Sequence, residues 1–396
     1  MSAARRIAVV GASLAGVRVV RSLRRKGYEG EIVLIGEETE LPYDRPPLSK
    51  QFLTANRSVP IKRLEPESFY DGIDLRLGLR AVELRLRDRE VRLSDGSAIR
   101  ADHVVVATGS IARTLPALDG IEGVTCLRSA ADAERIRAAF ASGPRVVVIG
   151  GGFIGCEVAM SARRLGLQVT IVEALSAPVM RGVGPLVGGT IAALHRAHGV
   201  DVRLGATIAG HEADNRIRAV TLTDGSRLET DLVVVGIGAN PRTDWLDGSG
   251  LTLRNGLACD VFCRAVGGDG HVWAAGDVAS WPSERFGETM RIEHWANAVE
   301  QATAVAANLL DPTSATPYDP VPSCWSEQWG HKYRLVGRIQ PHDNTMLIHG
   351  SLREGPFAVT YSRGGLLRGA VTRDMPEAIT TVRERLGAQF LGRLVA

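Results

Sequence analysis

The sequence predicts an α/β fold with two doubly wound parallel sheets, followed by a smaller C-terminal α+β domain. Two glycine-rich strand-turn-helix patterns begin at Arg6 and Arg145. Each is followed by a similar segment, residues 91–109 and 220–238, and strand patterns such as "YRLVGRI" occur near the C-terminus. Strands that alternate with helices form parallel sheets, so the duplication predicts two related domains.

The two glycine turns are "GASLAG" from Gly11 and "GGGFIG" from Gly150. In such a turn the first glycine permits the bend, the second lets the backbone approach a pyrophosphate, and the third lets helix and strand pack closely. Phosphate then lies at the helix N-terminus. We expect two Rossmann-like nucleotide sites, with these candidate contacts: Gly11, Ser13, Leu14, Ala15 and Gly16 in the first, and Gly152, Phe153, Ile154 and Gly155 in the second.

An acidic residue is expected about 20 residues after each turn, where it binds a ribose hydroxyl. After the second turn, "LGLQVTIVEA" ends a strand on Glu173, and no arginine follows immediately, as a 2′-phosphate would prefer. After the first turn, Gly36 stands at the corresponding position and is followed by Glu37 and Glu38. The alternative for each glutamate is a solvated carboxylate at a strand end.

The repeat extends beyond the turns. "VRLSDGSAIRADHVVVATG" (91–109) and "VTLTDGSRLETDLVVVGIG" (220–238) match nearly position by position. Each predicts a hairpin with an Asp-Gly turn, then a buried strand that ends in glycine. The chain is therefore expected to hold two copies of one nucleotide-binding domain.

Composition excludes several classes of protein. The net charge is +3, without the basic and aromatic stripe of a nucleic-acid binder. No apolar run reaches the roughly 18 residues of a membrane span, and we expect a cytoplasmic protein with no membrane contact. The five cysteines form no C-x-x-C, and Cys259 and Cys263 lack further ligands for zinc, so no metal site is predicted.

With these motifs, the chain resembles the flavoprotein pyridine nucleotide-disulphide oxidoreductases, and among them the NADH-dependent ferredoxin reductases of bacterial oxygenase systems; apoptosis-inducing factor is a relative. The most specific element is "LPYDRPPLSK" (41–50), and "VVVATGS", "VWAAGDVA", "RIEHWANAVEQA" and "CWSEQWG" follow in family order. The resemblance covers nearly the whole chain. It implies a glutathione reductase-like fold, with FAD in the first site and NADH in the second, and hydride transfer between them.

Matching positions then imply further FAD contacts. Asp277 would bind the ribitol, and Lys50 would lie by the flavin and pair with Glu157, as the two residues closest to the chemistry. Lys50 could instead be a surface charge after a turn, and Trp325 could be structural packing. The remaining residues implied for FAD are Glu37, Glu38, Arg45, Val82, Ala107, Thr108, Gly109, Arg128, Gly276, His294, Trp295 and Trp325.

The resemblance also extends the second site. Phe153 would shield the flavin until nicotinamide enters, although it could be a plain core aromatic. Glu293 precedes His294 at a helix start near the two rings, Gly238 would lie at the mouth of the NAD site, and Arg181 would contact the adenosine phosphate or ribose.

We expect three domains. The FAD-binding domain comprises residues 1–113 and 242–312, the NAD-binding domain 114–241, and the C-terminal domain 318–396. The junctions "ARTLPALDG" and "GANPRTD" contain proline, as crossings between domains often do. The stretch "MPEAITTVRERLGAQF" is expected to form a helix on the C-terminal sheet.

The electron acceptor is expected to lie outside the chain. Related disulphide reductases need paired cysteines beside the flavin, and related peroxidases and oxidases need one near the "PPLSK" helix, but Leu48-Ser49-Lys50 offers none. A [2Fe-2S] ferredoxin is the expected partner, and it would serve a cytochrome P450 or a Rieske-type oxygenase. Arg334, Arg338 and Arg368 could help to dock it. We expect a monomer or weak dimer.

Two other classes of function stay open at this point. One is an NADH reductase for rubredoxin, quinone or a small molecule such as monodehydroascorbate. The other is a slowly reduced, NADH-sensing binding protein like apoptosis-inducing factor. A compact sequence without an added targeting segment favours the ferredoxin reductase.

Overall fold

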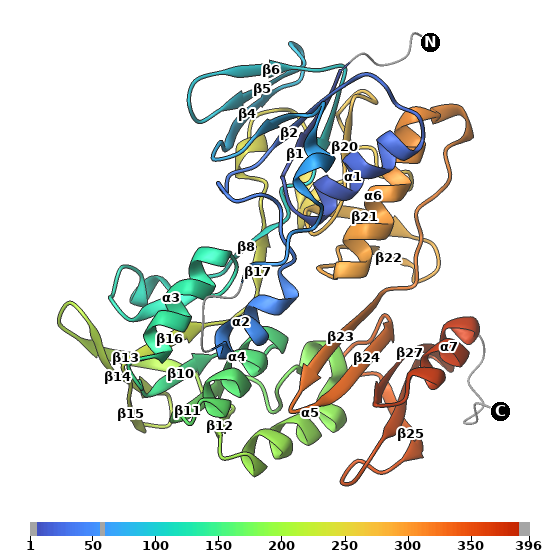
Figure 1. Ribbon diagram of the computed structural model, residues 1–396. Coiled ribbons are helices and arrows are strands. Elements are labelled where there is room, and N and C mark those ends of the chain that lie inside the picture. The colour runs from blue at the N-terminus through green and yellow to red at the C-terminus, as the bar shows by residue number, and fades with distance from the viewer. Residues whose placement is uncertain (1–5, 56–59, 388–396) are drawn as a thin grey trace. The chain divides into compact units, whose positions relative to one another are not determined.

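The computed structural model describes residues 6–55 and 60–387 (Figure 1). By contacts the chain divides into two compact units. Unit 1 contains Met1–Asp44, Lys62–Ile111 and Asn240–Pro322, and unit 2 contains Arg45–Ile61, Ala112–Ala239 and Ser323–Ala396. The chain passes between them within β8 (Ser110–Ala112) and β17 (Ala239–Pro241). The three-domain division expected from the sequence stays a prediction.

Unit 1 is built on a parallel sheet in the order β20-β7-β1-β2-β3. Helices α1 and α6 pack side by side in this unit (Figure 1). These elements are β1 (Arg6–Val10), α1 (Leu14–Arg25), β2 (Glu31–Ile35), β3 (Asp74–Arg76), β7 (His103–Val106), β20 (Val272–Ala274) and α6 (Trp295–Leu310). Strands β1, β2 and β7 are rich in buried β-branched residues because a parallel sheet is covered on both faces.

Two smaller sheets and three short 3₁₀ helices complete unit 1. The first sheet has the order β4-β5-β6 and the second β18-β19-β21-β22. Their bounds are β4 (Ala81–Arg85), β5 (Glu90–Leu93), β6 (Ala98–Arg100), β18 (Leu253–Arg254), β19 (Gly256–Ala258), β21 (Ala279–Ser283) and β22 (Glu288–Met290), with η2 (Glu67–Tyr70), η4 (Asp244–Leu246) and η5 (Pro312–Ser314).

Unit 2 repeats the design with a parallel sheet in the order β12-β11-β10-β16-β9. Its elements are η1 (Pro46–Ser49), α2 (Gln51–Thr54), η3 (Pro116–Leu118), β9 (Val124–Cys126), α3 (Ala130–Phe140), β10 (Val146–Ile149), α4 (Phe153–Arg164), β11 (Val169–Glu173), α5 (Met180–Ala197), β12 (Asp201–Leu204), β13 (Ile208–Ala213), β14 (Ile217–Leu222), β15 (Arg227–Glu229) and β16 (Leu232–Val235). The α/β fold with two parallel sheets is confirmed.

The last part of unit 2 is an antiparallel sheet in the order β23-β24-β27-β26-β25. Its strands are β23 (Ser323–Gln328), β24 (His331–Gly337), β25 (Asn344–Gly350), β26 (Phe357–Arg363) and β27 (Leu366–Arg373). Helix α7 (Pro376–Arg385) packs against β27 and β24, as the sequence predicted; the end of its predicted stretch, 388–390, lies outside the described residues. None of the helices formed by residues 6–55 and 60–387 combines the length and apolar character that a bilayer crossing requires.

The internal repeat is confirmed in detail. In each copy a hairpin, β5-β6 or β14-β15, leads into a strand of the parallel sheet, β7 or β16. The Asp95 carboxylate accepts hydrogen bonds from the Ser97 amide at 2.9 Å and hydroxyl at 2.6 Å, and Asp224 accepts the same pair from Ser226 at the same distances. The same pair of hydrogen bonds between an aspartate and a serine therefore stabilises the turn of both hairpins.

Arg145 fixes the start of β10 in unit 2. Its backbone N–H and Nε both donate to Asp231 Oδ2 at 2.9 Å, and Nη2 donates to Oδ1 at 2.9 Å. Hydrogen bonding from Arg145 lowers the pKa of Asp231 to about 2. Because the pKa falls on folding, the contact stabilises the protein above the ordinary aspartate pKa, and this stabilisation is lost as the pH falls toward 2.

We therefore expect Asp231→Asn to reduce the free energy of unfolding more at pH 7 than at about pH 3, measured by denaturant titration. Asp201→Asn is the matched control, because within residues 6–55 and 60–387 the Asp201 carboxylate accepts hydrogen bonds from Nε of its near neighbour Arg203 alone, and it should change the pH dependence less. Equal losses for Asp231→Asn at both pH values would contradict the assignment.

Candidate functional site

The first glycine turn joins β1 to α1 in unit 1. Gly11 has φ +118°, and a Cβ there would lie 2.1 Å from the Ala107 carbonyl oxygen at the end of β7. A Cβ on Gly16 would lie 1.9 Å from the Gly11 carbonyl oxygen. Side chains are excluded at both positions, so the turn brings the start of α1 against the carboxyl ends of β1 and β7.

The second turn, between β10 and α4 in unit 2, has the same geometry. Gly150 has φ +101°, and a Cβ there would lie 2.3 Å from the Gly236 carbonyl oxygen after β16. A Cβ on Gly155 would lie 2.1 Å from the Gly150 carbonyl oxygen. Both turns therefore meet the steric requirements of a dinucleotide-binding loop.

The N-terminus of the helix after each turn is suited to phosphate. At Ser13 before α1 and Gly152 before α4, no side chain caps the helix, and neither first turn contains an acidic residue among the residues described. The unpaired amides and the helix dipole both favour an anion there.

Glu173 lies at the end of β11, beside the second turn. Its Oε2 accepts a hydrogen bond from the Gly151 amide at 2.7 Å, and its Oε1 accepts one from the Leu175 amide at 2.8 Å. The structure thus joins the predicted acid to the predicted turn, 22 residues apart in the chain. A partly exposed carboxylate in this place can also accept from ribose hydroxyls.

The glutamates after β2 are held differently. Both oxygens of Glu37 lie 3.2 Å from Nη2 of Arg242, which also lies near Asp244, and the Tyr43 hydroxyl donates to Glu38. The Thr108 hydroxyl donates to the Arg242 carbonyl at 2.8 Å, and the Arg242 amide donates to the Gly109 carbonyl at 3.0 Å. Arg242, which sequence reasoning missed, therefore links Glu37 to the end of β7.

The "AAGDVA" segment meets the first turn in unit 1. A Cβ on Gly276 would lie 2.9 Å from Cβ of Ala15, and the Gly276 amide donates to Gln301 of α6 at 2.9 Å. Ser110 donates to Asp277 Oδ2 at 2.8 Å. The turn and this segment, far apart in the sequence, thus pack against each other.

Further predicted residues of unit 1 lie at the start of α6 and on β4. Trp295 Nε1 donates to Asp44 Oδ1 at 3.1 Å, His294 is the N-cap residue of α6, and Glu293 pairs with Arg291 at 2.7 Å. Val82 lies on β4 with 41% of its surface exposed.

Unit 2 holds four residues predicted to contact FAD. Arg45 Nη1 donates to the Arg128 carbonyl at 2.5 Å, which joins two of them across 83 residues of sequence. Lys50 Nζ donates to Glu157 Oε2 at 2.7 Å, as the resemblance implied. Trp325 lies on β23 and is 40% exposed.

The other predicted NAD contacts also lie in unit 2. The Phe153 ring lies beside Gly182, where a Cβ would be 3.5 Å from Cε2, and Arg181 is exposed in the first turn of α5. Gly238 has φ +104° and its carbonyl accepts from the Arg113 amide at 2.9 Å. Since each predicted set has members in both units, the FAD and NAD assignments stay predictions.

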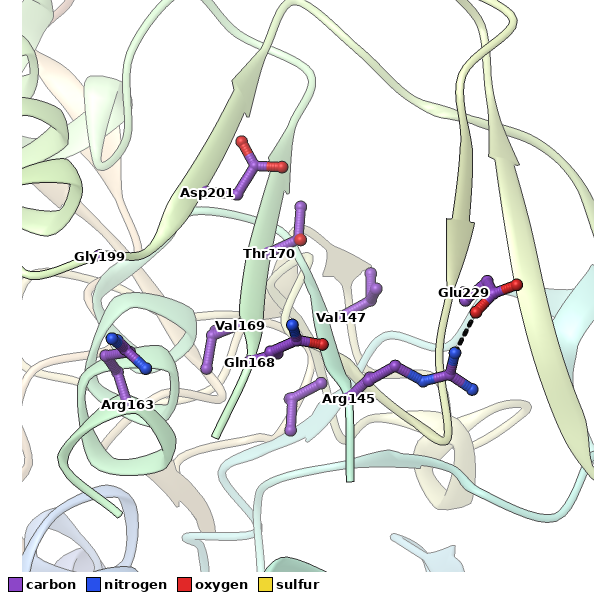
Figure 2. Close-up of a pocket in the computed structure, with 10 residues that line it drawn as sticks. Arg145, Val147, Arg163, Gln168, Val169, Thr170, Gly199, Asp201 and Glu229 are labelled. Atoms are coloured by element: carbon purple, nitrogen blue, oxygen red, sulfur yellow. Dashed lines mark hydrogen bonds and ion pairs between the residues drawn. The ribbon is translucent and has the colours of Figure 1, made fainter. Parts of the chain in front are cut away.

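A pocket of about 490 Å³ lies elsewhere in unit 2 (Figure 2). It is lined by the first residues of β10, β11 and β12, such as Val146, Val169 and Asp201, together with Arg163 and Glu229. This is the amino edge of the sheet, whereas Glu173 and the glycine turn lie at the carboxyl edge, where ligands of open α/β sheets bind. The pocket is therefore distinct from the candidate nucleotide site.

Comparison with known proteins gives a consistent result. A family model described as "Pyridine nucleotide-disulphide oxidoreductase" matches residues 5–302. Rhodocoxin reductase of Rhodococcus erythropolis is 36% identical over 97% of this chain and 90% of its own length. The ferredoxin reductase component of chlorobenzene dioxygenase from Cupriavidus sp. (strain PS12) is 38% identical over 93% of this chain and 89% of its own length.

Solved structures agree with the sequence relatives. The reductase in the crystal structure of the covalent putidaredoxin reductase-putidaredoxin complex is 33% identical, with a TM-score of 0.91, over 97% of this chain and 94% of that chain. The match spans both glycine turns, Glu173 and the Lys50-Glu157 pair. This chain belongs to the pyridine nucleotide-disulphide oxidoreductase family.

Proposed function

We propose that this chain is an FAD-containing ferredoxin–NAD(+) reductase, which takes hydride from NADH and passes single electrons to a [2Fe-2S] ferredoxin. That ferredoxin would supply a cytochrome P450 or a Rieske-type oxygenase. The names of the relatives support this function, since one is the ferredoxin reductase component of a dioxygenase and another is captured with putidaredoxin. The Lys50-Glu157 pair carries the proposal, because Lys50 lies in the "PPLSK" segment, where related peroxidases and oxidases are expected to hold a cysteine, and pairs there with a buried carboxylate.

The thiols of the chain are poor electron carriers. All five cysteines are free. Burial raises the pKa of Cys263 and of Cys324 to about 12, and it also raises the pKa of Cys156, which is fully buried beside Glu157. Thiol-disulphide exchange needs a thiolate, so these residues stay inert near neutral pH. Free thiols also suit a reducing compartment, and we place the activity in the cytoplasm.

The two glycine turns bind and orient the nucleotides. The amides at the starts of α1 and α4 would hold the two pyrophosphates, and Glu173 would accept hydrogen bonds from the NADH ribose. Orientation is a large part of catalysis here, since hydride transfer requires the donor and acceptor atoms in near contact. When bound, FAD supplies the conversion between a two-electron donor and a one-electron acceptor.

Lys50 supplies positive charge. Two of its three N–H groups have partners, Glu157 Oε2 at 2.7 Å and the Pro46 carbonyl at 3.2 Å. The third has no partner among the described residues and is available to a ligand. A fixed ammonium favours the negative charge that a flavin gains on reduction. Glu157 fixes the direction of the Lys50 side chain.

We expect the purified protein to be yellow and to reduce a [2Fe-2S] ferredoxin with NADH much faster than rubredoxin, a quinone or monodehydroascorbate. NADH oxidation with each acceptor at equal concentration is the measurement. A colourless folded protein that cannot be reconstituted with FAD would sink the proposal, as would a clear preference for one of the other acceptors.

Glu173→Gln should raise the KM for NADH about tenfold, because a hydrogen bond to a charged group contributes roughly 1.5–3 kcal/mol. FAD content should stay at the wild-type level. Glu37→Gln is the reciprocal control and should weaken FAD retention without raising that KM. Equal effects of Glu173→Gln on both nucleotides would remove Glu173 from the NADH site.

Lys50→Met keeps the length of the side chain but removes its charge. We expect flavin reduction by NADH to slow about a hundredfold, as seen when a preorganised donor is removed from a developing negative charge. Stopped-flow absorbance of the holoenzyme measures it. Lys50→Arg should recover part of the rate of flavin reduction. An unchanged rate in Lys50→Met would show that Lys50 has a structural role and no role in flavin reduction.

A further inference from the structure

The buried carboxylate of Glu157 lies at one end of a chain of hydrogen bonds that no known role of the site requires. Its Oε2 accepts from Ser49 Oγ at 2.5 Å and from Lys50, and its Oε1 accepts from Ser326 Oγ at 2.7 Å. Gln328 Nε2 lies 2.9 Å from Ser326 Oγ, and Gln328 Oε1 lies 3.1 Å from His195 Nε2. All of these residues belong to unit 2.

The direction of every proton in this chain follows from its first member. A carboxylate can only accept, so Ser326 donates its hydroxyl proton to Glu157. The oxygen of Ser326 then accepts from the Gln328 amide N–H, which leaves Gln328 Oε1 to accept from His195. The proton of His195 must therefore reside on Nε2.

His195 is suited to hold this arrangement. Its side chain is fully buried, and burial lowers its pKa to about 4, so the ring is neutral near pH 7. Its Nδ1 has no hydrogen-bond partner among the described residues, as expected for the unprotonated nitrogen.

Trp329 covers the His195 end of the chain. The His195 and Trp329 ring centroids are 5.8 Å apart with the rings at 74°, and the His198 ring stacks on the Trp329 ring at 4.0 Å and 12°. Trp329 has φ +55° in the turn between β23 and β24, an unfavourable conformation for a bulky residue. The strained backbone at Trp329 thus places its large ring against the buried His195.

We propose that Ser326, Gln328 and His195 form a one-way chain of hydrogen bonds that holds the Glu157 carboxylate in place and so fixes the Lys50 ammonium that would face the flavin. They are positioning residues, because they act only through Glu157. The expected effect of these residues on the flavin rests on the proposed function, whereas the hydrogen-bond chain itself does not. Loss of the donor to Oε1 frees the Glu157 carboxylate to move, and the Lys50 ammonium that it orients then moves away from the position where it would favour a reduced flavin.

The test begins with the unmutated holoenzyme. Nitrogen NMR of histidine-labelled protein should show His195 neutral with its proton on Nε2 across pH 6–8, with the resonance assigned by its loss in His195→Gln. A proton on Nδ1, or a charged ring in this range, would overturn the hydrogen-bond chain whatever the variants do. This readout does not depend on activity.

The variants test the consequence. Ser326→Ala should shift the flavin midpoint potential to more negative values and slow flavin reduction by NADH about tenfold, the effect of one hydrogen bond to a charged group. Gln328→Leu, which removes a neutral partner of Ser326, should act in the same direction with a smaller effect. His195→Leu should act in the same direction. His195→Gln should restore wild-type behaviour, because its amide N–H can replace Nε2–H.

Thr230→Val is the matched control. Thr230 is also fully buried in unit 2, and its hydroxyl lies within hydrogen-bond distance of the Arg145 and Leu232 carbonyls, at 3.1 and 3.0 Å. It should leave the potential and the rate unchanged. Wild-type values in Ser326→Ala, or an equal shift in Thr230→Val, would overturn the proposed role of the hydrogen-bond chain, whereas a wild-type protein without FAD or ferredoxin reduction would overturn the proposed function instead.

Discussion

The stability of one buried anion constrains unit 2. Glu157 lies on α4 with 5% of its surface exposed, and its partners come from the segment before α2 and from β23. An unpaired carboxylate at this depth would cost several kcal/mol, so the three parts of the chain must meet for any of them to be stable. The same contact orients Lys50, and thus links the packing of the unit to the position of an ammonium group that we propose faces the flavin.

The two parallel sheets share one backbone geometry at their glycine turns but differ in the acidic residues that follow. In both, the first glycine of the turn lies against a carbonyl at the end of the neighbouring strand, and the third lies against the carbonyl of the first. The difference lies in the acids. Glu173 binds its own turn through the Gly151 amide, whereas Glu37 pairs with Arg242. The same backbone turn is thus followed by differently bonded glutamates in the two sheets, as expected for sites that bind two different nucleotides.

The sequence predicted features that repeat or that need a special backbone. The turns were visible because only glycine fits positions such as Gly11 and Gly155, and the hairpins because Asp95 and Asp224 stand in identical contexts. The pairing of Lys50 with Glu157 came from the resemblance alone. Periodicity could not supply it, because the two residues are 107 positions apart.

The hydrogen-bond chain and Arg242 were missed for a physical reason. Ser326 and Gln328 are neutral, and a serine or glutamine in a strand carries no charge pattern. Their burial became visible only in the structure, where they occupy alternate positions of β23 and are both fully buried, as apolar side chains would be expected to be. Two polar residues on the inward face of a strand indicate a buried network. Nothing in the sequence distinguished Arg242 from the many other arginines of the chain.

The central claim is that this chain converts a hydride into two single electrons without using a thiol. An anaerobic titration tests it most directly. One equivalent of NADH should bleach the flavin, two equivalents of oxidised [2Fe-2S] ferredoxin should restore its colour, and the number of titratable thiols should stay constant throughout. A flavin that ferredoxin fails to reoxidise, or a change in thiol number that accompanies turnover, would contradict the account.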